Sequence, residues 1–254
     1  MGIEPVTGDL FSLAGRTALV TGGGSGIGRA IAEALSDAGA EILLAGRRQD
    51  PLQDALGNRQ GAWFAADVAT EDGIAALAEW ALARGNPPDI LVNAAGINLR
   101  QPADEITPEG WQQTLDVNLR APFFLTQALV SPMREKGWGR IINIASLQSL
   151  RAFQNGLAYG ASKGGVAQLT RAMAEAWSRH GINANALGPG FFPTDLTGAV
   201  FADKARAEAL AAQTAIGRNG EMSDLAGPAV FLASPASDYV TGQVLFVDGG
   251  FTAK

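Results

Sequence analysis

The sequence predicts a single α/β domain over residues 1–254, built on a doubly wound parallel sheet with helices on both faces. Three observations support this fold class. Short apolar runs alternate with stretches of helical periodicity along the whole chain, with no linker or change of composition between them. A glycine-rich segment joins the first apolar run to the first helical stretch. Small or polar residues follow the later runs, at the sheet edge where ligands bind in such folds.

Composition and charge exclude several classes of protein. The 254 residues are 47% hydrophobic and 17% charged, which suits one large buried core and argues against disorder. A net charge of −6 disfavours nucleic acid and anionic membranes as partners. With no cysteine and one histidine, His180, no metal site is expected. The N-terminus lacks the pattern of a signal peptide, and no apolar run approaches the ~20 residues of a membrane span, so we expect a cytoplasmic protein.

The first predicted strand covers residues 17–20 and runs into the glycine-rich turn. Apolar residues then recur at helical spacing until Gly39 ends the helix. A strand, a glycine turn and a helix together offer backbone N–H groups and a positive helix end to a phosphate. The spacing G-x-x-x-G-x-G differs from the dinucleotide fingerprint G-x-G-x-x-G, and an ordinary turn is the alternative. The candidate phosphate-binding residues are Gly22, Gly24, Ser25, Gly26, Ile27 and Gly28.

Two arginines follow the second predicted strand, residues 41–45. In a dinucleotide site this strand ends beside the adenosine ribose, where a carboxylate binds the 2′-hydroxyl and an arginine accommodates a 2′-phosphate. Gly46 provides no carboxylate, and Arg47 and Arg48 come directly after it. The sequence therefore favours NADP as the cofactor, with NAD as the alternative if the two arginines are solvated loop charges.

The third and fourth predicted strands also end in candidate cofactor residues. A strand over residues 63–66 precedes Asp67 and Val68. Asp67 either meets the adenine or caps the helix that begins near Glu71. A strand over residues 90–92 leads into small residues that would let a flat ring or a ribose lie against the backbone. These residues are Asn93, Ala94, Ala95 and Gly96.

A long helical region is predicted over residues 108–135, loosely interrupted around Pro122. It contains Asn118, and asparagine is mildly unfavourable inside a helix. Asn118 is therefore expected to have either a backbone-bonding or a catalytic role. The fifth strand, residues 141–145, ends at Ser146.

The C-terminal third completes the alternation. A sixth strand is predicted over residues 182–187. Residues 190–215 are expected to form a loop with short helical pieces, which suits a substrate lid. A helix over residues 224–233 and a strand over residues 243–247 end the chain.

Tyr159 and Lys163 form a Tyr-x-x-x-Lys pair on a predicted helix. Residues four apart lie on one helix face, about 6 Å apart along the axis. A phenol loses its proton only near pH ~10, but an adjacent ammonium favours the phenolate and lowers that pKa. The pair could therefore act as a general acid or base near neutral pH. An ordinary helix face is the alternative, and the glycine turn and Ser146 favour the catalytic interpretation.

Taken together, these motifs resemble those of the short-chain dehydrogenase/reductase superfamily over nearly the whole chain. Residues 21–28 match that family's cofactor turn, and residues 93–96 match its Asn-Asn-Ala-Gly motif with Ala94 in place of the second asparagine. Pro189 and Gly190 match the motif after its sixth strand. Four residues fall on its catalytic positions, namely Asn118, Ser146, Tyr159 and Lys163.

The resemblance implies a role for each catalytic residue. Tyr159 would exchange a proton with the substrate oxygen, and Ser146 would orient that oxygen. Lys163 would lower the pKa of Tyr159 and hold the nicotinamide ribose, while Asn118 would hold a water that relays protons. Hydride would pass between the substrate carbon and the nicotinamide. Cofactor contacts are also implied for Tyr159, Lys163, Pro189, Gly190 and Thr194.

The substrate expectation rests on two short runs. Residues 95–100 and 188–192 are similar to those of sugar-acid members of the family, of the gluconate 5-dehydrogenase and 2-keto-3-deoxygluconate dehydrogenase type. The resemblance thus implies a secondary alcohol and ketone interconverted on a sugar acid, a keto-sugar acid or a polyol. Arg100 or Arg151 could hold a carboxylate, with a solvated loop charge as the alternative for Arg100. The candidate substrate-binding residues are Arg100, Ser146, Gln148, Arg151, Tyr159 and Phe191.

Two other functions are compatible with the motifs. A 3-oxoacyl carrier-protein reductase would share every catalytic position but would need a basic docking patch. A non-enzymatic dinucleotide sensor could dispense with Tyr159 or Lys163, and here both are present. The resemblance also implies a homotetramer that pairs through the long helices and the C-terminal strand.

Overall fold

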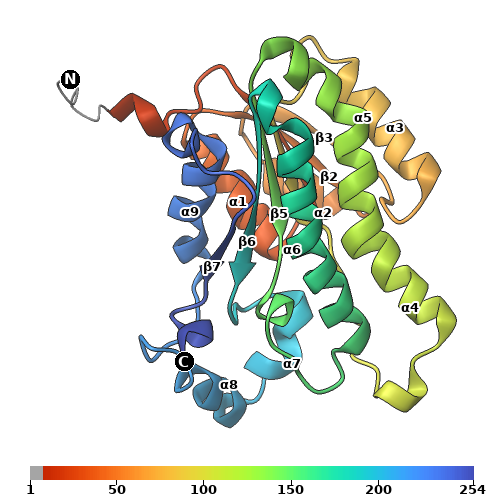
Figure 1. Ribbon diagram of the computed structural model, residues 1–254, viewed down its shortest axis with the longest axis vertical. Coiled ribbons are helices and arrows are strands. Elements are labelled where there is room, and N and C mark those ends of the chain that lie inside the picture. Colours follow the sequence, from red (N-terminus) through yellow and green to blue (C-terminus); the bar gives the residue numbers. More distant parts are fainter. Residues whose placement is uncertain (1–7) are drawn as a thin grey trace.

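Seven parallel strands form one sheet within residues 8–254, the part of the chain that the computed structural model describes (Figure 1). This confirms the predicted α/β fold class with a Rossmann-like sheet. The prediction that the chain has no signal peptide lies partly outside the described residues, at residues 1–7. The strands are β1 Thr17–Thr21, β2 Glu41–Gly46, β3 Gly61–Ala65, β4 Ile90–Asn93, β5 Gly139–Ile144, β6 Ile182–Pro189 and β7 Val244–Val247.

The order of the strands fixes where a ligand can bind. Across the sheet they run β3-β2-β1-β4-β5-β6-β7, so the order reverses between β1 and β4. These two strands are in register, with Thr21 opposite Asn93 at their carboxyl ends. At such a reversal the segments that follow the two strands leave toward opposite faces of the sheet, which opens a crevice beyond the strand ends. The glycine turn and residues 94–96 border this crevice.

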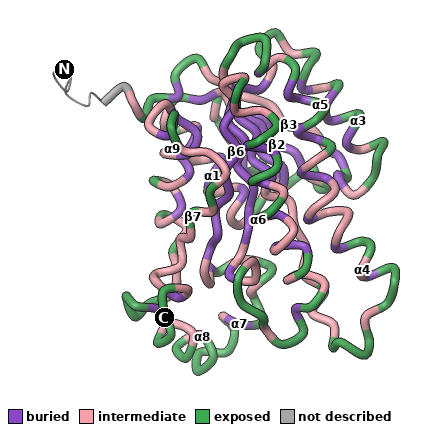
Figure 2. The backbone as a smooth tube through the Cα atoms, in the orientation of Figure 1, coloured by how far each residue is buried: buried purple, intermediate pink, exposed green. Residues whose placement is uncertain are grey.

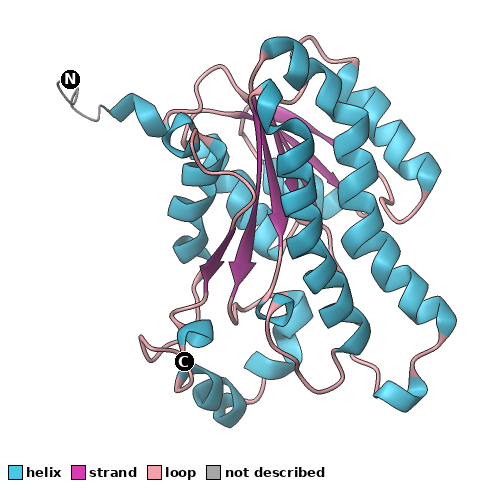
Figure 3. Ribbon diagram, viewed as in Figure 1, coloured by secondary structure: helices cyan, strands magenta, loops and turns pink. Residues whose placement is uncertain are grey.

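Helices cover both faces of the sheet (Figure 3). Alternate residues of each strand point to opposite faces, so Ala18 and Val20 pack in the cluster containing residues of α1, α2 and α9, and Leu19 packs with residues of α3, α5 and α6. The helices are α1 Gly26–Asp37, α2 Gln49–Leu56, α3 Glu71–Leu82, α4 Pro108–Leu115, α5 Ala121–Lys136, α6 Leu157–Trp177, α7 Gly198–Phe201, α8 Lys204–Ala211 and α9 Ala226–Ala233.

The central strands are buried on both faces, which explains their unbroken apolar runs (Figure 2). Beyond their carboxyl ends the chain is more exposed. There α7 and α8 lie at the foot of Figure 1, in the segment for which a substrate lid is predicted. None of the helices in residues 8–254 has the length and hydropathy needed to cross a membrane.

Three local features differ from the sequence-based prediction. The third strand begins at Gly61 rather than residue 63, because Gly61 already pairs with Ile42. The helix α2 was not predicted, since its core contacts come only from Leu52 and Ala55. The interruption predicted around Pro122 is a π-helical turn over Asp116–Arg120, just before that proline.

A chain of polar side chains joins β4, β5 and α6 below the crevice. The Asn93 side chain donates to Asn143 Oδ1 at 2.9 Å, and Asn143 Nδ2 donates to Thr170 Oγ1 at 3.0 Å. Asn143 has no exposed surface. Because buried polar groups are costly when unpaired, this chain fixes how the strand ends are placed against α6.

We predict that Asn143→Ala lowers the free energy of unfolding by about 2–3 kcal/mol, because it leaves buried partners on Asn93 and Thr170 unpaired. Urea unfolding at pH 7 measures this change. The exposed Gln53→Ala on α2 is the control and should stay within about 0.5 kcal/mol of the wild type. Equal stability of the two variants would contradict the role given to Asn143.

Candidate active site

The turn between β1 and α1 is a cradle that side chains cannot fill. Gly22 has φ +67°, and a Cβ there would lie 2.9 Å from the Ala95 nitrogen. A Cβ on Gly28 would overlap the Gly22 carbonyl oxygen. Ser25 precedes α1, yet its side chain caps none of the free N–H groups among the described residues, and no acidic residue stands in the first turn. The cradle therefore offers unpaired N–H groups and a positive helix end to a phosphate.

Thr21 fastens this cradle to the loop after β4. Its hydroxyl oxygen accepts hydrogen bonds from the backbone N–H groups of Ala94 at 3.1 Å and Ala95 at 3.2 Å. The Asn93 side chain points away from the cradle into the buried polar chain, so it does not line either cavity described here. Asn93 thus supports the loop, whereas Ala94, Ala95 and Gly96 border the space itself.

A cavity of about 590 Å³ extends from the cradle across the ends of β2 and β3. Arg47 and Arg48 lie in its wall, and both are exposed. The Arg48 guanidinium lies 3.9 Å from the Asp195 carboxylate. Arg29 on α1, by contrast, forms ion pairs with Glu33 and Asp54. The predicted cofactor residues on this wall are Gly22, Gly24, Ser25, Arg47, Arg48, Asp67, Val68, Ala95 and Gly96.

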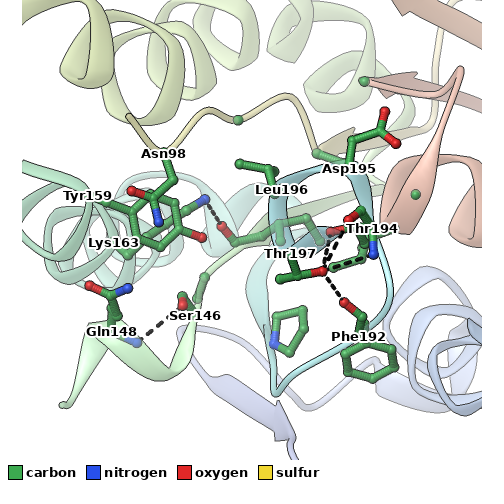
Figure 4. Close-up of a pocket in the computed structure, with 18 of the residues that line it drawn as sticks. Asn98, Ser146, Gln148, Tyr159, Lys163, Phe192, Thr194, Asp195, Leu196 and Thr197 are labelled. Carbon is green, nitrogen blue, oxygen red and sulfur yellow. Dashed lines mark hydrogen bonds between the residues drawn. The ribbon is translucent and has the colours of Figure 1, made fainter. Parts of the chain in front are cut away.

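A second cavity, of about 230 Å³, brings Ser146, Tyr159 and Lys163 together (Figure 4). Ser146 stands just past the end of β5, where its hydroxyl accepts from the Gln148 N–H at 3.1 Å. Tyr159 and Lys163 come from the first turns of α6, and the Lys163 ammonium lies 5.6 Å from the centre of the Tyr159 ring. The predicted pair therefore shares one helix face and points into the same cavity as Ser146.

Burial controls the protonation of both residues of the pair. Lys163 is 4% exposed, and its Nζ donates to the Ile144 carbonyl at 2.5 Å. Loss of solvent lowers its pKa to about 8. Burial also raises the pKa of Tyr159, against smaller opposing effects of the Ser146 hydroxyl and the Arg100 guanidinium. Desolvation is thus the largest effect on the pKa of Tyr159, and the lowering of this pKa by Lys163 stays a prediction.

Asn118 uses its side chain to hold the backbone. Its Oδ1 accepts from the Ile97 N–H at 2.9 Å, and its Nδ2 donates to the Ile97 carbonyl at 2.9 Å and to Ser162 Oγ at 3.0 Å. The sequence left a backbone-bonding or a catalytic role open for Asn118. In the structure its side chain bonds to the backbone of Ile97. Pro122 has no N–H to donate to the Asn118 carbonyl four residues earlier, which fits the π-helical turn here.

The candidate substrate residues do not all meet in the cavity. Arg100, Gln148 and Phe191 line it. Arg100 has φ +52° and donates from Nη2 to the Leu196 carbonyl at 2.8 Å, which ties the loop after β4 to the predicted lid. Arg151 lies outside this cavity and donates instead to the Phe251 carbonyl at 3.2 Å. The prediction that Arg151 contacts substrate is not supported by its place in the structure.

Most of the predicted site residues nevertheless gather around the smaller cavity. They are Gly22, Ser25, Gly26, Ile27, Gly28, Ala94, Ala95, Gly96, Arg100, Ser146, Gln148, Tyr159, Lys163, Pro189, Gly190, Phe191 and Thr194. Sequence reasoning missed Asp195, Leu196 and Thr197, which line the cavity through a short helical turn. The Thr194 and Thr197 hydroxyls cap this turn reciprocally, and two threonines three residues apart are a signal that could have identified it.

The site therefore combines a phosphate cradle at a sheet reversal with a buried Ser, Tyr and Lys beside it. No group of acidic, histidine or cysteine side chains within residues 8–254 could hold a metal ion. A dinucleotide fits the cradle because a side chain would fill the space at Gly22 and Gly28. These features define a dinucleotide-dependent oxidoreductase.

The chain belongs to the short-chain dehydrogenase/reductase family. Residues 22–252 match the short-chain family model described as enoyl-(acyl carrier protein) reductase. The chain is 41% identical to gluconate 5-dehydrogenase of Gluconobacter oxydans, with 97% of this chain and 98% of that protein covered. It is 43% identical to 2-dehydro-3-deoxy-D-gluconate 5-dehydrogenase of Bacillus subtilis, with 97% and 98% covered.

A solved structure is similar over the same extent. Gluconate 5-dehydrogenase from Burkholderia cenocepacia, crystallised in complex with NADP and tartrate, has a TM-score of 0.92 and 41% identity, with 97% of this chain and 98% of that chain covered. These comparisons confirm the resemblance inferred from the motifs. The protein is an NAD(P)-dependent oxidoreductase that acts on CH–OH groups.

The buried ammonium leads to a prediction about pH. The pKa of Lys163 falls from 10.5 to about 8 on folding, so the unfolded chain binds more protons between these values. The full cost of burying the charged Lys163 therefore applies below pH 8. This cost decreases as the pH rises to 10.5. We expect the stability of the wild type relative to Lys163→Met to increase by about 2–3 kcal/mol across that range.

Urea unfolding of both proteins between pH 7 and pH 10.5 measures this difference, and the comparison cancels the titration of groups that lie far from Lys163. A stability difference that does not depend on pH would show that Lys163 keeps its ordinary pKa in the folded protein.

Proposed function

We propose that this enzyme interconverts a secondary alcohol and a ketone on a sugar acid or keto-sugar acid, with NADP(H) as its cofactor. One observation carries the proposal: Arg100 lines the same small cavity as Ser146 and Tyr159. A guanidinium there can hold a substrate carboxylate while the hydroxyls contact a carbon further along the chain. The names of the similar proteins support this substrate class, since they act on gluconate or a deoxy-keto-gluconate.

Tyr159 is the proposed general acid and base. In ketone reduction its phenol gives a proton to the substrate oxygen, and in alcohol oxidation its phenolate takes that proton. The raised pKa keeps the phenol protonated at neutral pH, which is the form that reduction requires. Ser146 would donate a hydrogen bond to the same oxygen and so fix its position.

Lys163 would hold the ribose of the cofactor and provide positive charge beside Tyr159. The nicotinamide supplies the hydride chemistry when bound. Asn118 is proposed to support this arrangement through Ile97, whose backbone it holds on both sides. The Asn118 carbonyl, which Pro122 cannot satisfy, is the candidate acceptor for a water that relays protons.

The preference for NADP rests on the end of β2. Gly46 offers no carboxylate to a ribose 2′-hydroxyl, and Arg47 and Arg48 line the large cavity. Two guanidinium groups there would stabilise the charge of a 2′-phosphate. Gluconate 5-dehydrogenase from Burkholderia cenocepacia was crystallised with NADP, which supports the same choice for this chain.

We also propose that residues 190–215 close over the bound ligands as a lid. Arg100 already holds this segment through the Leu196 carbonyl, and Asp195 lies near Arg48. The whole of residues 1–254 would then act as one dinucleotide-binding and catalytic domain. Its cytoplasmic location stays a prediction from the sequence.

A homotetramer is proposed from the apolar side chains left exposed on two surfaces. Phe124 on α5 and Leu157 on α6 are 45% and 52% exposed, and Leu245 on the edge strand β7 is 37% exposed. Edge strands and apolar helix faces are commonly covered by a partner. We expect light scattering at micromolar concentration to give about four times the monomer mass. A monomer there would contradict the proposal.

Tyr159→Phe tests the proposed mechanism. The variant lacks the proton donor, so we predict that kcat falls by about 10²–10⁴-fold while the Kd for NADPH changes little. The matched control is Tyr239→Phe, because Tyr239 is fully exposed and no other tyrosine is present. Steady-state assays with gluconates, keto-gluconates, polyols and acyl thioesters give kcat, and fluorescence titration gives Kd.

Each outcome of this assay has a distinct meaning. Unchanged turnover in Tyr159→Phe would remove Tyr159 from the mechanism. Turnover of acyl thioesters in place of sugar acids by the wild type would assign the enzyme to the 3-oxoacyl carrier-protein reductases. Retained NADPH binding without turnover of any substrate would favour the non-enzymatic sensor.

Replacement of both Arg47 and Arg48 by serine tests the cofactor preference. Loss of the charged partners of a phosphate should raise KM for NADPH by about 10–100-fold and leave kcat/KM with NADH nearly unchanged. Arg134→Ser is the control. Arg134 is exposed in the last turn of α5, just before the amino end of β5 and thus away from the carboxyl ends of the strands. Equal effects on the two cofactors would mean that these arginines serve as solvated loop charges.

A further inference from the structure

Three phenylalanine rings from distant parts of the chain form a triangle beside the active site. Phe153 comes from the loop after β5, Phe191 from the loop after β6 and Phe251 from the C-terminal segment. The ring centres are 5.9 Å apart for Phe153 and Phe191, 6.1 Å for Phe153 and Phe251, and 5.8 Å for Phe191 and Phe251. Such spacing is that of interacting aromatic pairs.

The three rings have different positions relative to the small cavity. Phe153 and Phe191 line it, whereas Phe251 stands behind them, does not line it and is 3% exposed. Phe251 therefore contacts the cavity only through the other two rings. Its bulk determines how far those rings can move back from the cavity.

Phe191 also borders a separate cavity of about 280 Å³ near the C-terminal turn. Gly249 and Gly250, just before Phe251, line this second space. The active-site cavity has a volume of about 230 Å³. Phe191 thus belongs to the partition between two spaces of similar size, and Phe251 supports it from behind.

The C-terminal segment is held firmly enough to act as a support. The Asp248 carboxylate accepts from the Gly250 and Thr252 N–H groups at 2.9 Å and from the Thr252 hydroxyl at 2.7 Å. Arg151 donates to the Phe251 carbonyl, and its guanidinium carbon lies 5.7 Å from the centre of the Phe251 ring. These contacts fix Phe251 against the loop that carries Phe153.

We infer that Phe251 is a positioning residue that sets the size of the substrate pocket, and that Arg151 holds it in place. With the Phe251 ring present, the partition keeps the pocket small enough that only a short polar substrate fits, such as the sugar acid of the proposed function. The inference rests on that proposed function for its substrate. Removal of the ring leaves a cavity into which Phe191 can turn, and the two spaces then join. The enlarged pocket would accept longer ketones and hold the short substrate less closely.

The experiment compares Phe251→Ala with Phe64→Ala. Phe64 also belongs to an aromatic pair, with Trp80 at 5.2 Å, and it lies on β3 outside the small cavity. Reduction of ketones of graded size with NADPH, from five- and six-carbon keto acids to 2-octanone, gives kcat and KM for each protein. Fluorescence titration gives the Kd for NADPH.

For Phe251→Ala we expect KM for the six-carbon keto acid to rise about 10-fold with kcat changed much less, because the substrate is held less closely. The ratio of kcat/KM for 2-octanone to that for the best short substrate should rise by at least about 10-fold. The Kd for NADPH should not change. Phe64→Ala should alter stability alone.

Arg151→Met keeps the test valid if Phe251→Ala does not fold. Arg151 is exposed, so its replacement removes the hydrogen bond to Phe251 without opening the core. It should shift the same size ratio in the same direction, by a smaller factor, and Arg151→Lys should restore part of the wild-type ratio. A ratio unchanged in both Phe251→Ala and Arg151→Met would overturn the inference.

Failure of the proposed function would look different. A wild type that reduces neutral short ketones but no keto-sugar acid would reject that substrate, while the size ratio would still test the partition. If no ketone is reduced, a crystal structure of Phe251→Ala decides the matter. Joined cavities with Phe191 displaced support the inference, and an unchanged partition contradicts it.

Discussion

Parallel pairing of β1 with β4 is the constraint on which the rest of the structure depends. The two strands end side by side, with Thr21 opposite Asn93, but their chains continue to opposite faces of the sheet. The space between the departing chains cannot be closed by the backbone. Gly22, Ser146 and Pro189 face this space from the ends of strands, and Tyr159 and Lys163 face it from the first turns of α6.

Burial of the Lys163 ammonium shows how much surrounding structure such a site requires. An unpaired buried charge is costly, and here the Ile144 carbonyl at the end of β5 accepts a hydrogen bond from the ammonium. Asn118 connects Ile97 with Ser162, so the loop after β4 and the helix α6 keep their spacing around the ammonium. Rigid positioning of this kind reduces the reorganisation needed during a proton transfer.

The sequence alone was sufficient for the fold class, and it named most of the residues that line the small cavity. Strand ends in a parallel sheet share one edge, so Gly22, Ser146 and Pro189 could be expected to meet without knowledge of the packing. The position of Arg151 could not be predicted, because its partner Phe251 lies 100 residues further along the chain. The pKa of Tyr159 was also beyond sequence reasoning, since the pattern reveals the neighbouring charge but not the loss of solvent.

Thr21 has a consequence for protein engineering. Its hydroxyl accepts hydrogen bonds from the N–H groups of Ala94 and Ala95, which lie more than seventy positions further along the chain. The glycine turn and the loop after β4 therefore form one mechanical unit. A cofactor turn moved alone into another scaffold would lose this fastening. Transplantation should therefore carry both segments together, with a short hydroxyl side chain kept at their junction.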